Sequence, residues 1–161
     1  MRFYLAAAFS RRAELAAYAA ELRALGHTVT SRWHEGECHQ ASEEELLGPD
    51  QTVATRLASE DWDDLERAEL LIAFTDGQQH RHGARHAEFG LALGLHMVCW
   101  VCGPSEHIFH SLADSHVANW RECLALMAAK VSSRGQKQPG LIIEEAESPV
   151  AMGTEQAPEK P

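Results

Sequence analysis

The sequence is short of positive charge, of aromatic residues and of long hydrophobic runs. Its 161 residues include 14 Lys and Arg against 24 Asp and Glu, and the formal net charge is −10. A chain of this charge lacks the basic stripe that duplex binding requires. No stretch approaches the ~20 consecutive apolar residues of a membrane-spanning helix. We therefore expect neither a nucleic-acid partner nor a membrane partner.

The sequence also lacks an export signal and has only four cysteines. The apolar opening MRFYLAAAF gives way to Ser10, Arg11 and Arg12, at the point where the apolar core of a secretory signal would continue. Cysteines in a chain without such a signal are expected to be reduced thiols. These features predict a cytoplasmic protein.

Metal and cofactor motifs are absent as well. No glycine-rich phosphate-binding fingerprint is present, so a nucleoside triphosphate or NAD cofactor lacks support. Cys99 and Cys102 form a C-x-x-C pattern, but residues three apart in a strand point to opposite faces. His80, His82 and His86 could supply ligands, yet no Cys or acid stands at an established zinc spacing from them. We expect no cofactor and no metal, and a polar loop that lines a ligand site.

What the sequence does contain is a regular alternation of strand and helix patterns. Apolar or β-branched runs predict strands at 2–9, 27–33, 69–75 and 96–102, with a brief strand near 116–118. Helical periodicity predicts helices between Ser10 and Gly26 and at 49–68, 84–95, 105–112 and 119–131, with Ser10 as an N-cap. This order is typical of a small doubly wound, flavodoxin-like α/β domain with a parallel sheet of four to five strands.

The alternation ends at Val131, where the composition changes to Ser, Gly, Gln, Pro and Glu. We expect a single domain over residues 1–131 and a disordered tail over residues 132–161. Ligands of doubly wound sheets bind beyond the carboxyl ends of the strands. The candidate site residues are therefore sought there.

Glu88 is the most informative candidate at that edge. It lies about one turn into the helix predicted at 84–95, where the helix dipole favours an ionised carboxylate that could act as a nucleophile. The alternative is a glutamate that only stabilises its own helix. Asp61, on the preceding helix, could approach Glu88 and form the pair of carboxylates used in glycosyl chemistry; the alternative is a solvated acidic face. Tyr4 could direct its hydroxyl to a carboxylate at this edge or simply fill the core.

Cations follow the first strand. Ser10 and Arg11 open a helix, where free N–H groups and a guanidinium could hold a phosphate or a carboxylate. The pattern is short and carries little specificity by itself.

Taken together, these residues resemble the nucleoside 2-deoxyribosyltransferase family and the related nucleoside 5′-monophosphate N-glycosidases. The likeness spans roughly residues 2–131. It rests on three motifs: Phe3-Tyr4-Leu5-Ala6-Ala7, Asp61-x-x-x-Leu65-x-x-Ala68-Glu69, and Gly83-x-x-His86-x-Glu88-x-Gly90.

The resemblance implies a role for each candidate. Glu88 would be the nucleophile that forms a glycosyl ester at C1′ of the sugar, Tyr4 would orient it, and Asp61 would handle the proton of the leaving base. His82 stands where the transferases have an aspartate that contacts the base. With Ser10, Arg11 and Arg85, this departure favours a nucleotide or phosphate-tolerant substrate. His110 falls where family members lend a polar residue to the neighbouring subunit, so a homodimer or larger homo-oligomer is expected.

Two other functions remain open at this point. The same crevice could serve a non-catalytic nucleotide-binding or sensing module. It could also belong to an NAD-cleaving glycohydrolase, because another group of flavodoxin-like domains uses a crevice glutamate against an N-glycosidic bond. Transfer of the sugar to a second base and transfer to water are both compatible with the sequence.

Overall fold

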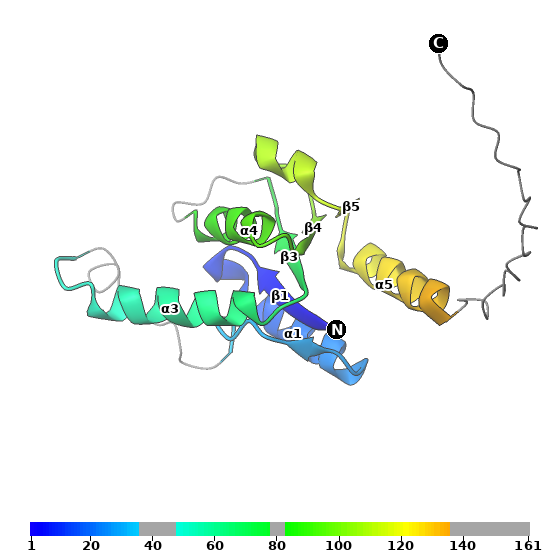
Figure 1. The fold of residues 1–161 in the computed structure, drawn as a ribbon, viewed down its shortest axis with the longest axis horizontal. Helices are drawn as coiled ribbons and strands as arrows, with labels where there is room; N and C mark the ends of the chain where they lie inside the picture. Colours follow the sequence, from blue (N-terminus) through cyan, green and yellow to red (C-terminus); the bar gives the residue numbers. More distant parts are fainter. Residues whose placement is uncertain (36–47, 78–82, 136–161) are drawn as a thin grey trace, which may run out of the picture.

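The computed structural model describes residues 1–35, 48–77 and 83–135, and the calls on Cys38, His80, His82 and the predicted tail from 136 onward lie outside these residues (Figure 1). The described residues form one five-stranded sheet in the order β2-β1-β3-β4-β5, with every neighbouring pair parallel. The strands are β1 (Arg2–Ala6), β2 (Thr28–Val29), β3 (Leu70–Phe74), β4 (Val98–Cys102) and β5 (Ser115–Val117). The predicted doubly wound α/β fold is confirmed.

Helices connect the strands in the order predicted. They are α1 (Arg12–Ala24), α3 (Thr52–Glu66), α4 (Ala84–Gly94) and α5 (Trp120–Gly135), with short 3-10 helices η1 (Phe9–Arg11) and η2 (Ile108–Leu112). None of the helices in the described ranges is long and apolar enough to cross a membrane.

The strand order decides which helices share a face. Crossovers between parallel strands are right-handed, so the connections that run from β1 toward β2 and from β3 toward β4 cover opposite faces. Tyr18 of α1 stacks on Phe74 and on Trp120 of α5, with ring centroids 5.4 and 4.5 Å apart, which places α1 and α5 on one face. Helices α3 and α4 cover the other face, and the chain changes direction between β1 and β3, where ligands of such sheets bind.

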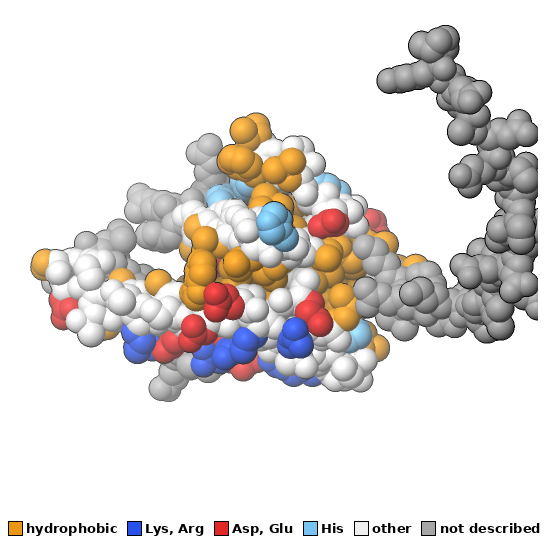
Figure 2. All heavy atoms as spheres, in the orientation of Figure 1, with side chains coloured by type: hydrophobic (Ala, Val, Ile, Leu, Met, Phe, Trp, Pro, Cys, Tyr) orange, Lys and Arg blue, Asp and Glu red, His pale blue; other side chains and the backbone are white. Residues whose placement is uncertain are grey.

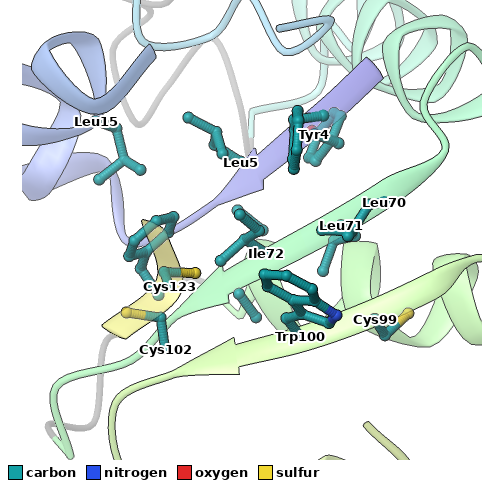
Figure 3. Packing of buried hydrophobic residues seen from close by; sticks show 14 of the residues in the cluster. Tyr4, Leu5, Leu15, Leu70, Leu71, Ile72, Cys99, Trp100, Cys102 and Cys123 are labelled. Carbon is teal, nitrogen blue, oxygen red and sulfur yellow. The ribbon is translucent and has the colours of Figure 1, made fainter. Parts of the chain in front are cut away.

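The core is built from the continuous apolar runs of the central strands. All five residues of β3 are buried, as are four of the five in β1 and in β4. Strands covered by helices on both faces need apolar residues at every position, which is why these runs do not alternate with polar residues. Figure 3 shows these side chains packed on both sides of the strands.

The two cysteines of the C-x-x-C pattern diverge, as predicted. Figure 3 shows the Cys102 sulfur facing Cys123 of α5 and the Cys99 sulfur well removed from it. The Cys99 thiol contacts the carbonyl oxygen of Met97 instead, at 3.5 Å, and burial raises its pKa to about 12. All three are free, buried thiols.

Some predicted element ends are wrong. Ser10 is not the N-cap of α1, because it lies inside the 3-10 helix η1 that precedes α1. Arg11 takes the cap position, without a side-chain cap hydrogen bond. Strand β2 is shorter than 27–33, because from Ser31 onward the backbone and side chains bond to other groups: Ser31 Oγ accepts from the N–H of Leu5, and Trp33 Nε1 donates to the Leu5 carbonyl. Helix α5 continues past the predicted end at Val131.

Gly103 brings the ends of β3 and β4 together. Its φ is +122°, and a Cβ at this position would stand 2.3 Å from the carbonyl oxygen of Thr75. Only glycine tolerates both the conformation and the approach. The carboxyl edge of the sheet is therefore closed tightly beside β3.

Candidate active site

The site is centred on a hydrogen bond between β1 and α4. The hydroxyl of Tyr4 donates to Oε1 of Glu88 at 2.9 Å. Tyr4 has no exposed surface, so its ring is fixed by the core while its hydroxyl reaches the helix. Glu88 as a whole residue is partly exposed, but its carboxyl group is the buried end that meets Tyr4. The structure thus brings together two residues that the sequence analysis selected as candidates.

The surroundings of Glu88 make its charge costly. Burial and, to a smaller extent, the charge of Asp61 raise the pKa of Glu88 to about 8, although the hydrogen bond from Tyr4 acts in the opposite direction. The expectation that the helix dipole would keep this carboxylate ionised is wrong. Helix α4 has no acidic residue in its first turn, and the dipole effect fades beyond that turn.

Asp61 belongs to the same electrostatic group. Burial first, and then the neighbouring charges of Asp64 and Glu60, raise the pKa of Asp61 to about 6, while Arg32 acts against the shift. The charge of Asp61 also contributes to the raised pKa values of Tyr4 and Glu88. Three predicted site residues from β1, α3 and α4 thus meet on one face of the sheet.

Asp64 is a residue of this group that the sequence reasoning missed. Its carboxylate is 1% exposed and accepts from the backbone N–H of Arg32 at 3.0 Å and from its Nε at 2.9 Å, and it also pairs with Arg67. The available signal was its position seven residues after the buried Leu57, on the same side of α3.

Ser10 and Arg11 follow β1 at the carboxyl edge of the sheet, but they do not offer an unpaired cation to a ligand. The guanidinium of Arg11 donates twice to Glu14, at 2.8 Å each, and its Nη1 lies 3.4 Å from the carbonyl oxygen of Thr75 at the end of β3. Ser10 is exposed in η1. The charge of Arg11 is therefore already balanced within the protein.

Arg85 is likewise paired. It is 3% exposed, and its Nη2 and Nε lie 2.5 and 3.1 Å from Oε2 of Glu106. The other oxygen of Glu106 accepts from the N–H groups of Asp76 and Gly77, at 3.1 and 3.0 Å. The prediction that Arg85 holds a substrate phosphate is not supported, because the buried carboxylate occupies the guanidinium and ties it to the loop after β3.

His110 is not placed as the resemblance implied. Its side chain has no exposed surface, and burial together with the neighbouring His107 and His86 lowers its pKa to about 4. A side chain enclosed in its own chain does not extend into a neighbouring subunit, so that expectation is wrong for this conformation. The predicted base contact, His82, lies outside the described residues.

Comparison with known proteins bears on the fold. No protein-family model matches the sequence, and no curated protein matches it. Among solved structures, the fold is similar to that of a 2-deoxyribosyltransferase from the psychrotolerant bacterium Bacillus psychrosaccharolyticus, described as a biocatalyst for nucleoside synthesis. The identity is 18%, the TM-score is 0.56, and the match covers 76% of this chain and 90% of the other. At this identity the likeness shows that the two chains share a fold.

Proposed function

We propose that this protein is a nucleoside 2-deoxyribosyltransferase-like enzyme that cleaves the N-glycosidic bond of 2′-deoxynucleosides or their 5′-monophosphates. The observation that carries the proposal is the Tyr4–Glu88 hydrogen bond at the point where the strand order reverses, within the electrostatic reach of Asp61. A carboxylate held by a tyrosine, with a second carboxyl group nearby, is suited to a double displacement at a glycosidic carbon. The fold shared with a 2-deoxyribosyltransferase agrees with this proposal.

In the first step Glu88 attacks C1′ as the bond from C1′ to the base nitrogen breaks. Tyr4 holds Oε1, so Oε2 is the attacking oxygen. The base leaves with the bonding electron pair and takes a proton from Asp61. In the second step an acceptor attacks C1′ from the opposite face, Glu88 departs as the carboxylate, and Asp61 takes back a proton. A second base as acceptor makes the enzyme a transferase, and water makes it a hydrolase.

The paired carboxyl groups share the proton that this cycle requires. Two interacting acids with raised pKa values hold one proton between them over an intermediate pH range. Because the pKa of Glu88 is raised further than that of Asp61, the shared proton rests mainly on Glu88. The reactive form, with Glu88 ionised and Asp61 protonated, is therefore the minor of the two singly protonated forms, and turnover proceeds through it. A 2-deoxy sugar suits the reaction because it lacks the electron-withdrawing 2′-hydroxyl, so the oxocarbenium-like transition state forms more easily.

Release of free base, followed by chromatography, tests the proposal. The wild-type protein is incubated with 2′-deoxynucleosides, ribonucleosides, their 5′-monophosphates and NAD, each with and without a second base. Glu88→Gln is the inactive variant, and Glu66→Gln, an exposed glutamate on α3, is the matched control. We expect base release from deoxyribosyl substrates by the wild type and the control only.

The other outcomes identify the alternatives. Binding of nucleotides without base release supports a sensing module, and release of nicotinamide supports an NAD-cleaving enzyme. Both contradict the proposal. Comparison of nucleosides with 5′-monophosphates decides the substrate class, which Arg11 and Arg85 do not, because both cations are already paired.

A further inference from the structure

Three histidines far apart in the sequence meet beside α4. His86 comes from the first turns of this helix, His107 directly precedes η2, and His110 lies within it. One ring nitrogen from each histidine lies within 4.8 Å of the other two. The ring centroids of His107 and His110 are 3.9 Å apart, and those of His86 and His107 are 4.6 Å apart. Figure 2 shows histidine side chains around the base of η2.

The cluster buries nitrogen atoms that no residue in the described ranges contacts through a hydrogen bond. Within the part of the chain that the structure describes, both ring nitrogens of His107 and Nε2 of His110 are buried and have no hydrogen-bond partner. Buried polar atoms are normally paired, and each exception requires an explanation. A neutral imidazole ring offers a lone pair on one of its two nitrogens. A bound cation would use these lone pairs.

We propose that His86, His107 and His110 hold a divalent transition-metal ion, with Zn²⁺ as the best-suited ion. Neutral imidazole is a preferred ligand of Zn²⁺, and three histidine ligands with a fourth position for water or another oxygen are an established donor set. Nitrogens bound tetrahedrally at ~2.0–2.1 Å from zinc stand about 3.4 Å apart. Small rotations of the side chains are enough to reach this spacing from within 4.8 Å.

The surroundings fit a metal site. Oε2 of Glu106 lies 3.7 Å from Nε2 of His86. Metal-binding histidines commonly direct the other ring N–H to a carboxylate, which fixes the tautomer and leaves the lone pair on the remaining nitrogen, here Nδ1. Arg85 and two backbone N–H groups in turn hold Glu106 in place. His116 also contacts the carbonyl oxygen of His110 at 2.7 Å, which steadies η2.

Loading the ion changes one hydrogen bond. The N–H of Glu106 lies 3.2 Å from Nδ1 of His110, so the neutral ring carries its proton on Nε2. Coordination through Nε2 moves that proton to Nδ1, and coordination through Nδ1 replaces the amide contact. In both cases a long hydrogen bond is exchanged for a metal bond and the ring stays neutral.

This site differs from the Tyr4–Glu88 pair and does not rest on the proposed function. His86 and Glu88 are two residues apart in α4, a spacing that puts side chains on different sides of a helix. The ion would join the start of α4 to η2 and so hold in place the helix that carries Glu88. The expectation of no metal came from sequence spacing, which does not show that residues after β4 return to α4.

Metal titration of the full-length protein tests the site. The chelator-treated protein is titrated with Zn²⁺ alone against a chromophoric chelator, and the bound metal is counted. His107→Ala removes one ligand. His96→Asn, an exposed histidine just after the same helix, is the matched control. We expect one tightly bound Zn²⁺ per protein chain in the wild type and the control. In His107→Ala the affinity for Zn²⁺ should fall more than about 10-fold, because loss of a direct ligand costs at least as much as loss of a partner that only hydrogen-bonds to a ligand.

A second measurement keeps the test independent of how well the variant folds. Nitrogen-15 spectra of the histidine rings of the wild-type protein are recorded with and without Zn²⁺. Shifts of the ring nitrogens of His86, His107 and His110 support the site. Shifts confined to other histidines, unchanged affinity in a folded His107→Ala, or no binding of Zn²⁺ by the wild type would overturn it.

Discussion

At the scale of single residues, Glu88 and Asp61 have different tasks, and their surroundings separate their proton affinities. Burial is the largest cause of the raised pKa in both residues. The charges of Asp64 and Glu60 add to the shift of Asp61, and the charge of Asp61 adds to the shift of Glu88. The pKa of Glu88 is raised to about 8 and that of Asp61 to about 6. With these pKa values the shared proton rests mainly on Glu88, and the proposed reaction uses the minor form in which that proton has moved to Asp61.

The first prediction concerns the pH dependence of base release. Below the pKa near 6 both carboxyl groups are protonated and Glu88 is no nucleophile, whereas above the pKa near 8 both are ionised and no proton reaches the leaving base. The plot of kcat/KM against pH is therefore expected to be a bell with limbs near 6 and 8. A rate that stays constant from pH 5 to pH 9 would contradict this account.

The second prediction concerns Tyr4. Replacing Tyr4 by Phe keeps the ring in the core but removes the donor to Glu88, and a hydrogen bond to a charged group contributes about 1.5–3 kcal/mol. We expect kcat/KM to fall about 10- to 100-fold and the upper limb of the pH profile to move up by about one unit, because ionised Glu88 loses its stabilising partner.

Tyr18→Phe is the matched control for this variant, because Tyr18 is the second tyrosine of the chain and its hydroxyl donates to Glu14 instead, at 2.7 Å. It should leave the upper limb unchanged. Equal pH profiles for Tyr4→Phe and the wild type would show that the hydrogen bond has no part in the reaction.

At the scale of elements, two helices end in the same way with different residues. After α1 the N–H of His27 bonds to the carbonyl of Leu22 at 3.0 Å, and Gly26 takes a φ of +81°. After α4 the N–H of Met97 bonds to the carbonyl of Ala92 at 3.0 Å, but His96 takes the left-handed position, with a φ of +56°. Glycine is the favoured residue at this position, so the left-handed conformation of His96 after α4 costs conformational free energy.

The third prediction follows from this difference. His96→Gly is expected to stabilise the protein by about 1 kcal/mol, which raises the melting temperature by about 3 °C, because the left-handed strain is relieved. Gly26→Ala is expected to destabilise it by a similar amount. Thermal unfolding monitored by circular dichroism measures both, and a lower melting temperature for His96→Gly would refute the argument.

The elements show where sequence reasoning succeeds and where it stops. The runs that became β1, β3 and β4 are apolar throughout because helices cover both faces, so their pattern was sufficient. The position of Ser10 after a strand was not sufficient to predict an N-cap, because the choice between an N-cap and a 3-10 turn depends on the packing of η1. Glu88 was found through its place on a helix after a strand, whereas its raised pKa depends on burial that only the fold reveals.

Contacts between distant segments are the least predictable part of the site. Arg85 looked like a ligand for phosphate until the structure paired it with Glu106. The cluster of His86, His107 and His110 joins segments separated by β4, and no spacing rule connects them. Local sequence patterns predicted the helices and strands. Contacts between side chains that only the folded sheet brings together could be found only in the structure.

At the scale of the whole molecule, η2 exposes a group of large apolar side chains. Figure 2 shows hydrophobic side chains over η2 and across the face below it. Ile108, Phe109 and Leu112 are 81%, 57% and 61% exposed. Exposed apolar patches of this kind mark interaction surfaces. The homodimer expected from the family resemblance stays a prediction, and this surface is where we place its contact.

The fourth prediction tests that contact. If the apolar side chains of η2 form the contact of a homodimer, sedimentation of the wild-type protein should give about twice the chain mass of 17.8 kDa. A stable dimer buries ~800 Å² of the surface of each partner, so the contact would extend beyond η2 itself. Ile108→Asp combined with Leu112→Asp should give the mass of a single chain, and Glu66→Gln should not change the mass. A wild-type protein that sediments as a single chain at micromolar concentration would contradict the prediction.

The central claim is that Glu88 forms a covalent bond with the sugar, and the most direct test is the mass of the protein during turnover. The enzyme is mixed with a 2′-deoxynucleoside, quenched in acid and analysed by peptide mass spectrometry. We predict one added deoxyribosyl unit on the peptide that contains Glu88, absent in a folded Glu88→Gln variant and absent with the ribonucleoside. Base release by the wild type with no adduct on this peptide, or base release by Glu88→Gln, would contradict the account.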